Sequence, residues 1–158
     1  MATLKLQGGR MLTVIPSDNA KIPYPNVVTS GTNTSASSLK LINSGATFIT
    51  SKVSVGDIVY NTTDSSAATV QSVDSETQLT LNANIFSAGS KAYTIYNGTM
   101  NETSGGCVFQ TGGAGNVVCV NQAGDTATLV GVAGQYHPIN VVQIKSTDTT
   151  ATLITAIW

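Results

Sequence analysis

The segment that decides the fold runs from Gly56 to Leu81 and reads GDIVYNTTDSSAATVQSVDSETQLTL. Its apolar residues form short, largely β-branched runs, which are separated by groups of Asp, Asn, Ser and Thr. Short β-branched runs bounded by turn-forming residues are typical of strands and not of helices. The groups at residues 64–66 and 74–76 are expected at hairpin tips, because Asp and Ser side chains bond to the backbone of turns. The segment therefore predicts strands joined by tight turns.

The same texture extends along the chain, so we predict an all-β fold with negligible helix. Helix is limited to single turns at residues 46–51 and 84–88, since such short, polar segments do not persist as helices. The expected strands are Met11 to Ile15, Asn26 to Thr29, Leu39 to Ile42, Ile58 to Asn61, Ala67 to Val73, Gln78 to Leu81, Ala92 to Tyr96, Cys107 to Thr111, Val117 to Asn121, Thr126 to Val132, Val141 to Ser146 and Thr152 to Trp158.

Three regions of the chain differ in texture. Residues 31–97 are expected to form a compact, five-strand barrel-like module, and residues 98–158 an antiparallel C-terminal module, read as a meander of hairpins within a β-sandwich or jelly-roll-like sheet assembly. Residues 1–30 contain Pro16, Pro23 and Pro25, and each proline removes a backbone donor. We expect residues 1–30 to be an extended arm that packs with the C-terminal module; a plain N-terminal arm is the alternative.

The composition excludes several classes of protein. Only 9% of the 158 residues are charged, the net charge is −1, and the chain holds 16 Ser and 23 Thr. No cluster of Lys and Arg suits nucleic acid, and neither a signal peptide nor an apolar run long enough to span a membrane is visible. Hydrophobic residues at 41% suffice for a core. A near-neutral surface provides little repulsion between copies, which favours self-assembly.

The residues needed for catalysis are sparse. The single histidine, His137, lies between Gly134 and Pro138 in an expected turn, and no nucleophile elbow or metal-binding motif accompanies it. The glycines of residues 112–115 are expected at a hairpin tip, since no Lys follows them as in a phosphate-binding loop. We therefore expect no enzymatic activity, no cofactor and no metal.

The cysteines and aromatic residues leave alternatives open. Cys107 and Cys119 flank the expected 112–116 hairpin, so a cross-strand disulfide is geometrically feasible. Two buried thiols are favoured, because a chain without a signal peptide is made in a reducing compartment. The aromatic residues are expected in the core, with a sugar-stacking platform as the alternative. Trp158 either completes a sheet or offers an apolar hook to a partner. These aromatic residues are Tyr24, Tyr60, Tyr93, Tyr96, Tyr136 and Trp158.

Several phrases of the sequence resemble a known class of protein. They are GRMLTVIPSDNA at residues 9–20 with IPYPN at 22–26, GDIVYNTT at 56–63, YHPI at 136–139 and TTATLI at 149–154. They resemble small virion structural proteins of tailed bacteriophages, especially those of cyanobacterial and marine hosts, and in size the head decoration or cement proteins. The resemblance implies a β-rich, non-enzymatic protein that forms trimers over the junctions between major capsid protein capsomers. It supplies no site residue position by position.

The resemblance predicts a cement protein that is made in the host cytoplasm and sits on the capsid surface. Its expected partners are the major capsid protein and other copies of itself, with no nucleic acid and no membrane. The alternatives are a fibre, neck or tail component, or a receptor- or sugar-binding module. The strands at Met11 to Ile15 and Thr152 to Ile157 are expected edges for strand addition. The expected capsid or intersubunit contacts are Met11, Val14, Ile15, Tyr24, Ile157 and Trp158.

Overall fold

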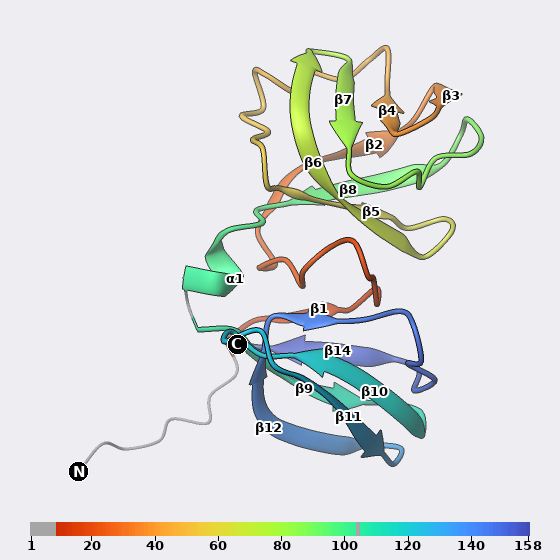
Figure 1. Ribbon diagram of the computed structural model, residues 1–158. Coiled ribbons are helices and arrows are strands. Elements are labelled where there is room, and N and C mark those ends of the chain that lie inside the picture. Colours follow the sequence, from red (N-terminus) through yellow and green to blue (C-terminus); the bar gives the residue numbers. More distant parts are fainter. Residues whose placement is uncertain (1–8, 104) are drawn as a thin grey trace.

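The computed structural model describes residues 9–103 and 105–158, and this part of the chain contains fourteen strands and one short helix (Figure 1). The fold is all-β, as predicted, and the paired strands are antiparallel. The elements are β1 (Met11–Thr13), β2 (Val27–Thr32), β3 (Ser35–Ser37), β4 (Lys40–Ile42), β5 (Ile58–Asn61), β6 (Ser66–Ser75), β7 (Gln78–Leu81), β8 (Ala92–Tyr96), α1 (Met100–Thr103), β9 (Cys107–Thr111), β10 (Gly115–Val120), β11 (Thr126–Gly131), β12 (Gln135–Val141), β13 (Gln143–Ile144) and β14 (Ile154–Ile157).

The upper module of Figure 1 is a barrel built from seven strands in the order β2-β8-β5-β6-β7-β4-β3. The long strand β6 pairs with β5 through its first half and with β7 through its second half. The two end strands, β2 and β3, are separated only by Asn33 and Thr34, so they are consecutive parts of one bent strand. The sheet therefore curves round so that its two end strands meet at this bend. Its core includes Leu41, Phe48, Val59, Val70, Leu79, Phe86 and Ile95.

Asn33 holds the bend that closes the barrel. Its side chain is 1% exposed, and the amide nitrogen donates to the backbone oxygens of Ser35 (3.1 Å) and Ala88 (2.9 Å). Its side-chain oxygen accepts from the backbone N–H of Lys91 at 2.7 Å. Because a buried amide must satisfy its donors and acceptor, these three partners hold the bend against the β8 end of the barrel.

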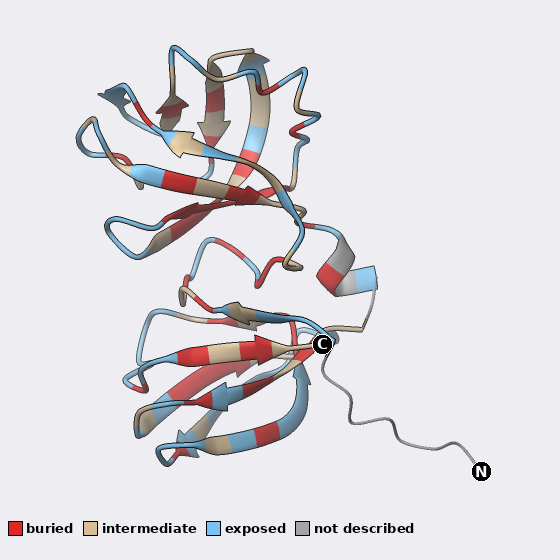
Figure 2. Cartoon of the chain, turned by 180° about the vertical axis from the view of Figure 1, so that it is seen from behind, coloured by how far each residue is buried: buried red, intermediate tan, exposed pale blue. Residues whose placement is uncertain are grey.

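The lower module is a sandwich of two sheets, β1-β14-β9-β12 and β11-β10-β13 (Figure 1). Figure 2 shows that buried residues alternate with exposed ones along several of these strands, as expected where one face of a sheet covers a core. The core consists of Val14, Ile22, Cys107, Phe109, Val117, Cys119, Val141, Ile144, Ala151, Ile154 and Ala156.

The C-terminal module is not the predicted meander, because β9 and β10 do not pair. They lie in different sheets, and residues 112–114 cross from one sheet to the other. This crossing is held by backbone bonds from Gly112 N to Leu153 O (3.0 Å) and from Gly113 N to Thr152 O (2.9 Å). These bonds tie the loop to the segment before β14. Cys107 and Cys119 consequently sit in opposite sheets as free, buried thiols.

The N-terminal residues are divided between the two modules. Strand β1 pairs with β14 in the sandwich, whereas β2 pairs with β8 in the barrel. The predicted boundary after residue 30 therefore falls inside a barrel strand and has to move to the start of β2 at Val27. The reason is that β2 pairs with β8 and packs Val28 against the barrel core. The positions of the prolines do not indicate this pairing.

Residues 14–26, here called the strap, run between the two modules (Figure 1). On the sandwich side, Ser17 N donates to Ile144 O (2.9 Å) and Ile22 N to Val142 O (2.8 Å), so the strap covers the edge at β13. On the barrel side, the buried Ser17 hydroxyl donates to Ala67 O at 3.0 Å.

Asn19 and an apolar cluster complete the junction between the modules. The backbone oxygen of Asn19 accepts from Thr69 Oγ1 (3.1 Å) and from Asn82 Nδ2 (2.6 Å). The apolar cluster consists of Ala20, Ile58, Tyr60 and Ala67, with Leu12, Ile15 and Tyr96 packed against it. The modules are therefore joined by a shared core and not by a free linker.

Helical structure is limited, as predicted. Residues 46–51 contain a hydrogen-bonded turn, with Ser51 N donating to Thr47 O at 2.7 Å. Residues 84–88 do not form the expected turn, and the short helix α1 at Met100–Thr103 was not expected. Among the described residues, no helix has the length and apolar character needed to cross a bilayer.

Candidate interaction surfaces

The C-terminal Trp158 is held inside the molecule. Its indole Nε1 donates to Asn101 Oδ1 on α1 at 2.8 Å, and its ring meets the edge of Tyr24 with centroids 5.5 Å apart. The guanidinium of Arg10 lies 5.3 Å from the Tyr24 ring centroid, close enough for a cation–π contact. Both rings are only half-buried, but their contacts serve to fasten the chain end. Two roles were expected for Trp158: the end of a strand in the sheet, or an apolar contact for a partner. The structure places Trp158 directly after β14, where its backbone N–H donates to Arg10 O at 3.0 Å.

The other expected contact residues differ in how exposed their side chains are. Met11 is 69% exposed on β1, and Ile157, its half-buried neighbour across the β1–β14 pair, lies directly opposite. Val14 is 5% exposed in the sandwich core and Ile15 packs into the junction cluster, so these two side chains are used inside the molecule. The two expected strand edges, β1 and β14, pair with each other. Met11 is thus the most accessible of the six.

Two of the aromatic residues, Tyr60 and Tyr93, lie in the interior. Tyr60 and Tyr93 are 3% and 2% exposed, and the Tyr93 hydroxyl accepts from Asn43 Nδ2 at 2.8 Å inside the barrel. Burial raises the pKa of both phenols, with Tyr60 affected more strongly. The expectation of core positions is confirmed for these two tyrosines.

His137 lies in a strand, not in the predicted turn. It is 6% exposed on β12 and stacks on Phe109 across the β9–β12 pair, with ring centroids 4.6 Å apart. The turn was predicted because Pro138 follows, but proline is tolerated on an edge strand. No group of three or more His, Cys, Asp or Glu side chains within the described ranges could hold a metal ion. His137 therefore serves here as a packing residue.

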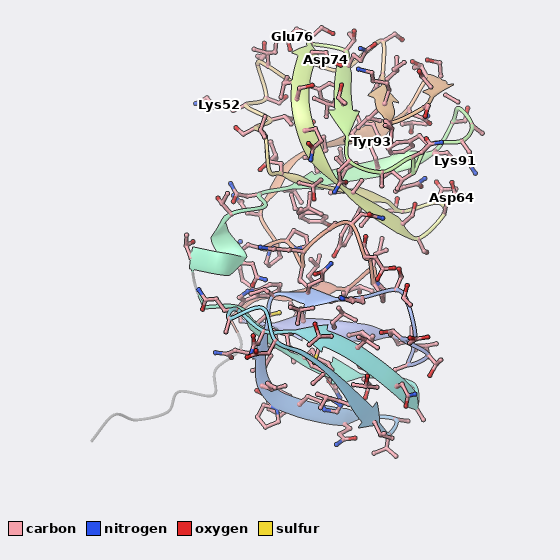
Figure 3. The ribbon with its side chains drawn as sticks, in the orientation of Figure 1. Lys52, Asp64, Asp74, Glu76, Lys91 and Tyr93 are labelled. Atoms are coloured by element: carbon pink, nitrogen blue, oxygen red, sulfur yellow. The ribbon has the colours of Figure 1, made fainter. Side chains whose placement is uncertain are left out.

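The charged side chains of the barrel stabilise turns and strand pairs (Figure 3). Asp74 accepts from Lys40 Nζ (2.8 Å), and Ser72, Gln78 and Thr80 also donate to it. The Lys40 bond, followed by those from Ser72 and Gln78, holds the pKa of Asp74 well below its ordinary value. The contacts of Asp74 therefore connect β4, β6 and β7.

A hollow of about 380 Å³ lies where the strap meets the barrel. Its wall includes Asp18, Asn19 and Lys21 from the strap, and Gly98 and Thr99 from the segment before α1. Asp18 is occupied, because it accepts from the hydroxyls of Ser146 (2.6 Å) and Thr147 (2.8 Å). Those bonds lower the pKa of Asp18. The carboxylate of Asp18 in this hollow is therefore used to hold the strap against residues 146 and 147.

Several exposed apolar side chains lie on β11, on β12 and on the connection between these two strands. Val130 and Val132 are 76% and 63% exposed, and Tyr136 and Ile139 are 37% and 38% exposed. Leu153, which is 74% exposed, contacts Gly112, the residue after β9. We call the surface formed by residues 126–139 the open side of the sandwich.

The open side is also free of charge. Asp125 and Lys145 are charged, but no Asp, Glu, Lys or Arg lies between them in the sequence. This uncharged stretch can be seen in the sequence, but the charge content of the whole chain does not reveal it. Uncharged strands with exposed valines are unusual on a monomer surface, where edges normally carry charges or prolines.

Comparisons with known proteins add no relative: no family model, curated protein or solved structure matches the chain.

Proposed function

We propose that the protein is a bacteriophage capsid decoration protein that binds the outer surface of the assembled head as a trimer and stabilises the shell. The observation that carries the proposal is the uncharged open side of the sandwich, combined with carboxylates elsewhere, such as Asp18 and Asp74, that are occupied by structural contacts. The short phrases that resemble small phage virion proteins support the same class. A protein of this kind needs recognition surfaces and a rigid body, and no reacting group.

The rigid junction between the modules suits such a role. A cement protein strengthens a shell through many copies, so each contact can be modest while the lattice is held strongly. The strap bonds to both modules and buries an apolar cluster between them. A load applied to one module would therefore be passed to the other.

The first test is the abundance of the protein in purified virions relative to the major capsid protein, measured by quantitative mass spectrometry. A ratio of order one, together with a trimer in solution, is the expected result. A few copies per particle would instead assign the protein to a fibre, neck or tail, and absence from the particle would overturn the proposal.

The second test measures binding to heads that lack the protein. Deleting residues 1–8 leaves β1 intact, whereas a larger N-terminal deletion would remove core residues such as Val14. We expect this deletion and Met11→Asp to reduce occupancy on the heads. Val55→Asp is the matched control, because Val55 is 63% exposed but lies on the barrel. Full occupancy by both the deletion and Met11→Asp would disprove a capsid contact at this end of the chain.

A further inference from the structure

The outer edge of β11 carries backbone groups whose direction follows from its neighbour β10. Val118 N donates to Thr149 Oγ1 (2.9 Å), and Val118 O accepts from Lys145 N (2.8 Å), so both groups point away from β11. Thr128 stands directly opposite Val118. Opposite residues in an antiparallel pair either exchange both bonds or neither. The N–H and C=O of Thr128 therefore point outward from the sheet edge.

The same alternation applies to Thr126 and Val130. Their partners on β10, Val120 and Asn116, also direct backbone bonds away from β11, with Val120 O accepting from Val142 N and Asn116 O from Thr150 N. Within the described part of the chain, no strand pairs with this outer edge. Thr126, Thr128 and Val130 thus offer a row of outward donors and acceptors.

The other edges are short, covered or interrupted. The outer edge of β1, at the end of its sheet, spans only three residues. The end strands of the barrel sheet, β2 and β3, follow each other directly in the chain, and the strap covers β13 through Ser17 and Ile22. Strand β12 contains Pro138 and shifts register between His137 and Val141, two devices that block the addition of a strand. Strand β11, with the sequence TATLVG, has no charge, proline or bulge.

We propose that β11 pairs with β11 of a second copy, antiparallel about a two-fold axis at Thr128. In this register Thr128 faces Thr128 of the other copy, and Thr126 faces Val130. Each of these pairs exchanges both backbone hydrogen bonds, because all three residues direct their groups outward. The two three-stranded sheets become one continuous sheet.

A second copy suits this edge better than a charged partner. Both strands are uncharged, so pairing brings no like charges together, and Thr and Val are favourable cross-strand neighbours. Ala127 and Leu129, which pair with inward-facing residues of β10, also face each other across the new contact and continue the inner face of the sheet. The contact goes beyond the proposed function and does not depend on a capsid. On a decorated head it would connect neighbouring trimers.

The first test blocks the edge without breaking the sandwich. Thr128→Pro removes an outward N–H that β10 does not use, and Thr128→Lys places two positive charges opposite each other. Thr128→Val is the matched control, because it keeps both the β-branch and the N–H. We expect sedimentation of the full chain to show pairwise association, of single chains or of the proposed trimers, that Thr128→Val retains and that both other variants reduce at least tenfold. Circular dichroism melting verifies that each variant is folded.

The second test reads the register through cysteine cross-linking. Thr128→Cys should cross-link to itself, because Cα atoms of a hydrogen-bonded pair lie about 5.5 Å apart, within disulfide range. Val130→Cys alone should not, since two such residues would be about 13 Å apart along the strands. The native thiols should not interfere, because Cys107 and Cys119 are buried.

The outcomes are distinct. Association that is lost in Thr128→Pro and Thr128→Lys, with cross-linking at position 128 only, supports the proposal. A wild-type chain that stays monomeric, association unchanged in both edge variants, or equal cross-linking at position 130 would overturn it. These measurements use the isolated chain. The proposed β11 contact can therefore be disproved while the virion role holds, and the virion role can be disproved while the β11 contact holds.

Discussion

Gly98 is the position where the smallest change should have a large effect on the fold. A Cβ at Gly98 would lie 1.8 Å from the backbone oxygen of Gly56 and 3.1 Å from the Cα of Asp57. Both are backbone atoms, so no side chain can turn away to make room. Gly98 N also donates to Asp57 Oδ1 (3.2 Å), and the other oxygen of this buried carboxylate accepts from Ser54 N (2.9 Å). Gly98→Ala must therefore displace the turn that launches β5.

The expected magnitude follows from the type of clash. Overpacking in a well-packed region costs about 1–3 kcal/mol, and more when backbone has to move. We expect Gly98→Ala to lower the free energy of unfolding by about 3 kcal/mol. For a chain of this size, about 2–4 °C is lost per kcal/mol, which corresponds to a fall in Tm of roughly 6–12 °C. The assay is thermal unfolding followed by circular dichroism.

Gly45→Ala is the matched control. A Cβ there would meet only the Asn43 side-chain oxygen, at an ordinary contact distance of 3.7 Å. Its Tm should stay close to that of the wild type. A Gly98→Ala variant that melts within about 2 °C of the control would refute the argument that the 56–57 turn and residue 98 are in fixed, close contact.

Three further predictions concern the strap, acid stability and the thiols. Ser17→Ala should destabilise the chain by about 1 kcal/mol in urea unfolding, because the Ala67 carbonyl loses its buried donor; an unchanged midpoint would contradict the bond's role. Asp74→Asn should be less stable than the wild type at pH 7, and the difference should shrink as the pH falls from about 5 towards 2, because a carboxylate with a lowered folded-state pKa stabilises only while it is ionised; a gap independent of pH would disprove this. Burial raises the pKa of Cys107 to about 12, so the native protein should react with a thiol reagent at pH 8 far more slowly than the urea-unfolded chain, and equal rates would show that the thiol is accessible.

Much of the strand content could be predicted from local sequence. The bounds of β5, β7, β8 and β9 match the predicted ranges, because each is a β-branched or aromatic run with turn residues at its ends. Local patterns also predicted the barrel-like character of the middle region. The signal for the open side was present as well, in the absence of charge between Asp125 and Lys145, although a whole-chain average concealed it.

Other features were not predictable from local patterns. Strand β12 was read as a turn because of Pro138, and β9 and β10 were read as a hairpin because glycines separate them. In both cases long-range contacts decide the outcome: His137 stacks on Phe109, and the 112–113 loop bonds to residues 152–153. For the same reason, Met11 is exposed whereas Val14, which was also expected to contact a partner, is buried. The apolar character of a residue does not reveal whether it faces a core or solvent.

By itself, then, the sequence determined that this protein is built of short strands and carries little charge, because these properties depend on composition and on neighbours along the chain. Only the tertiary structure decided which strands pair, how the strap joins the modules and which edge stays open. Distant segments of the chain compete for the same backbone donors and acceptors, so strand pairing depends on the whole fold. Its outcome at β11 becomes visible only when the other strand pairs and the backbone bonds of β10 are known.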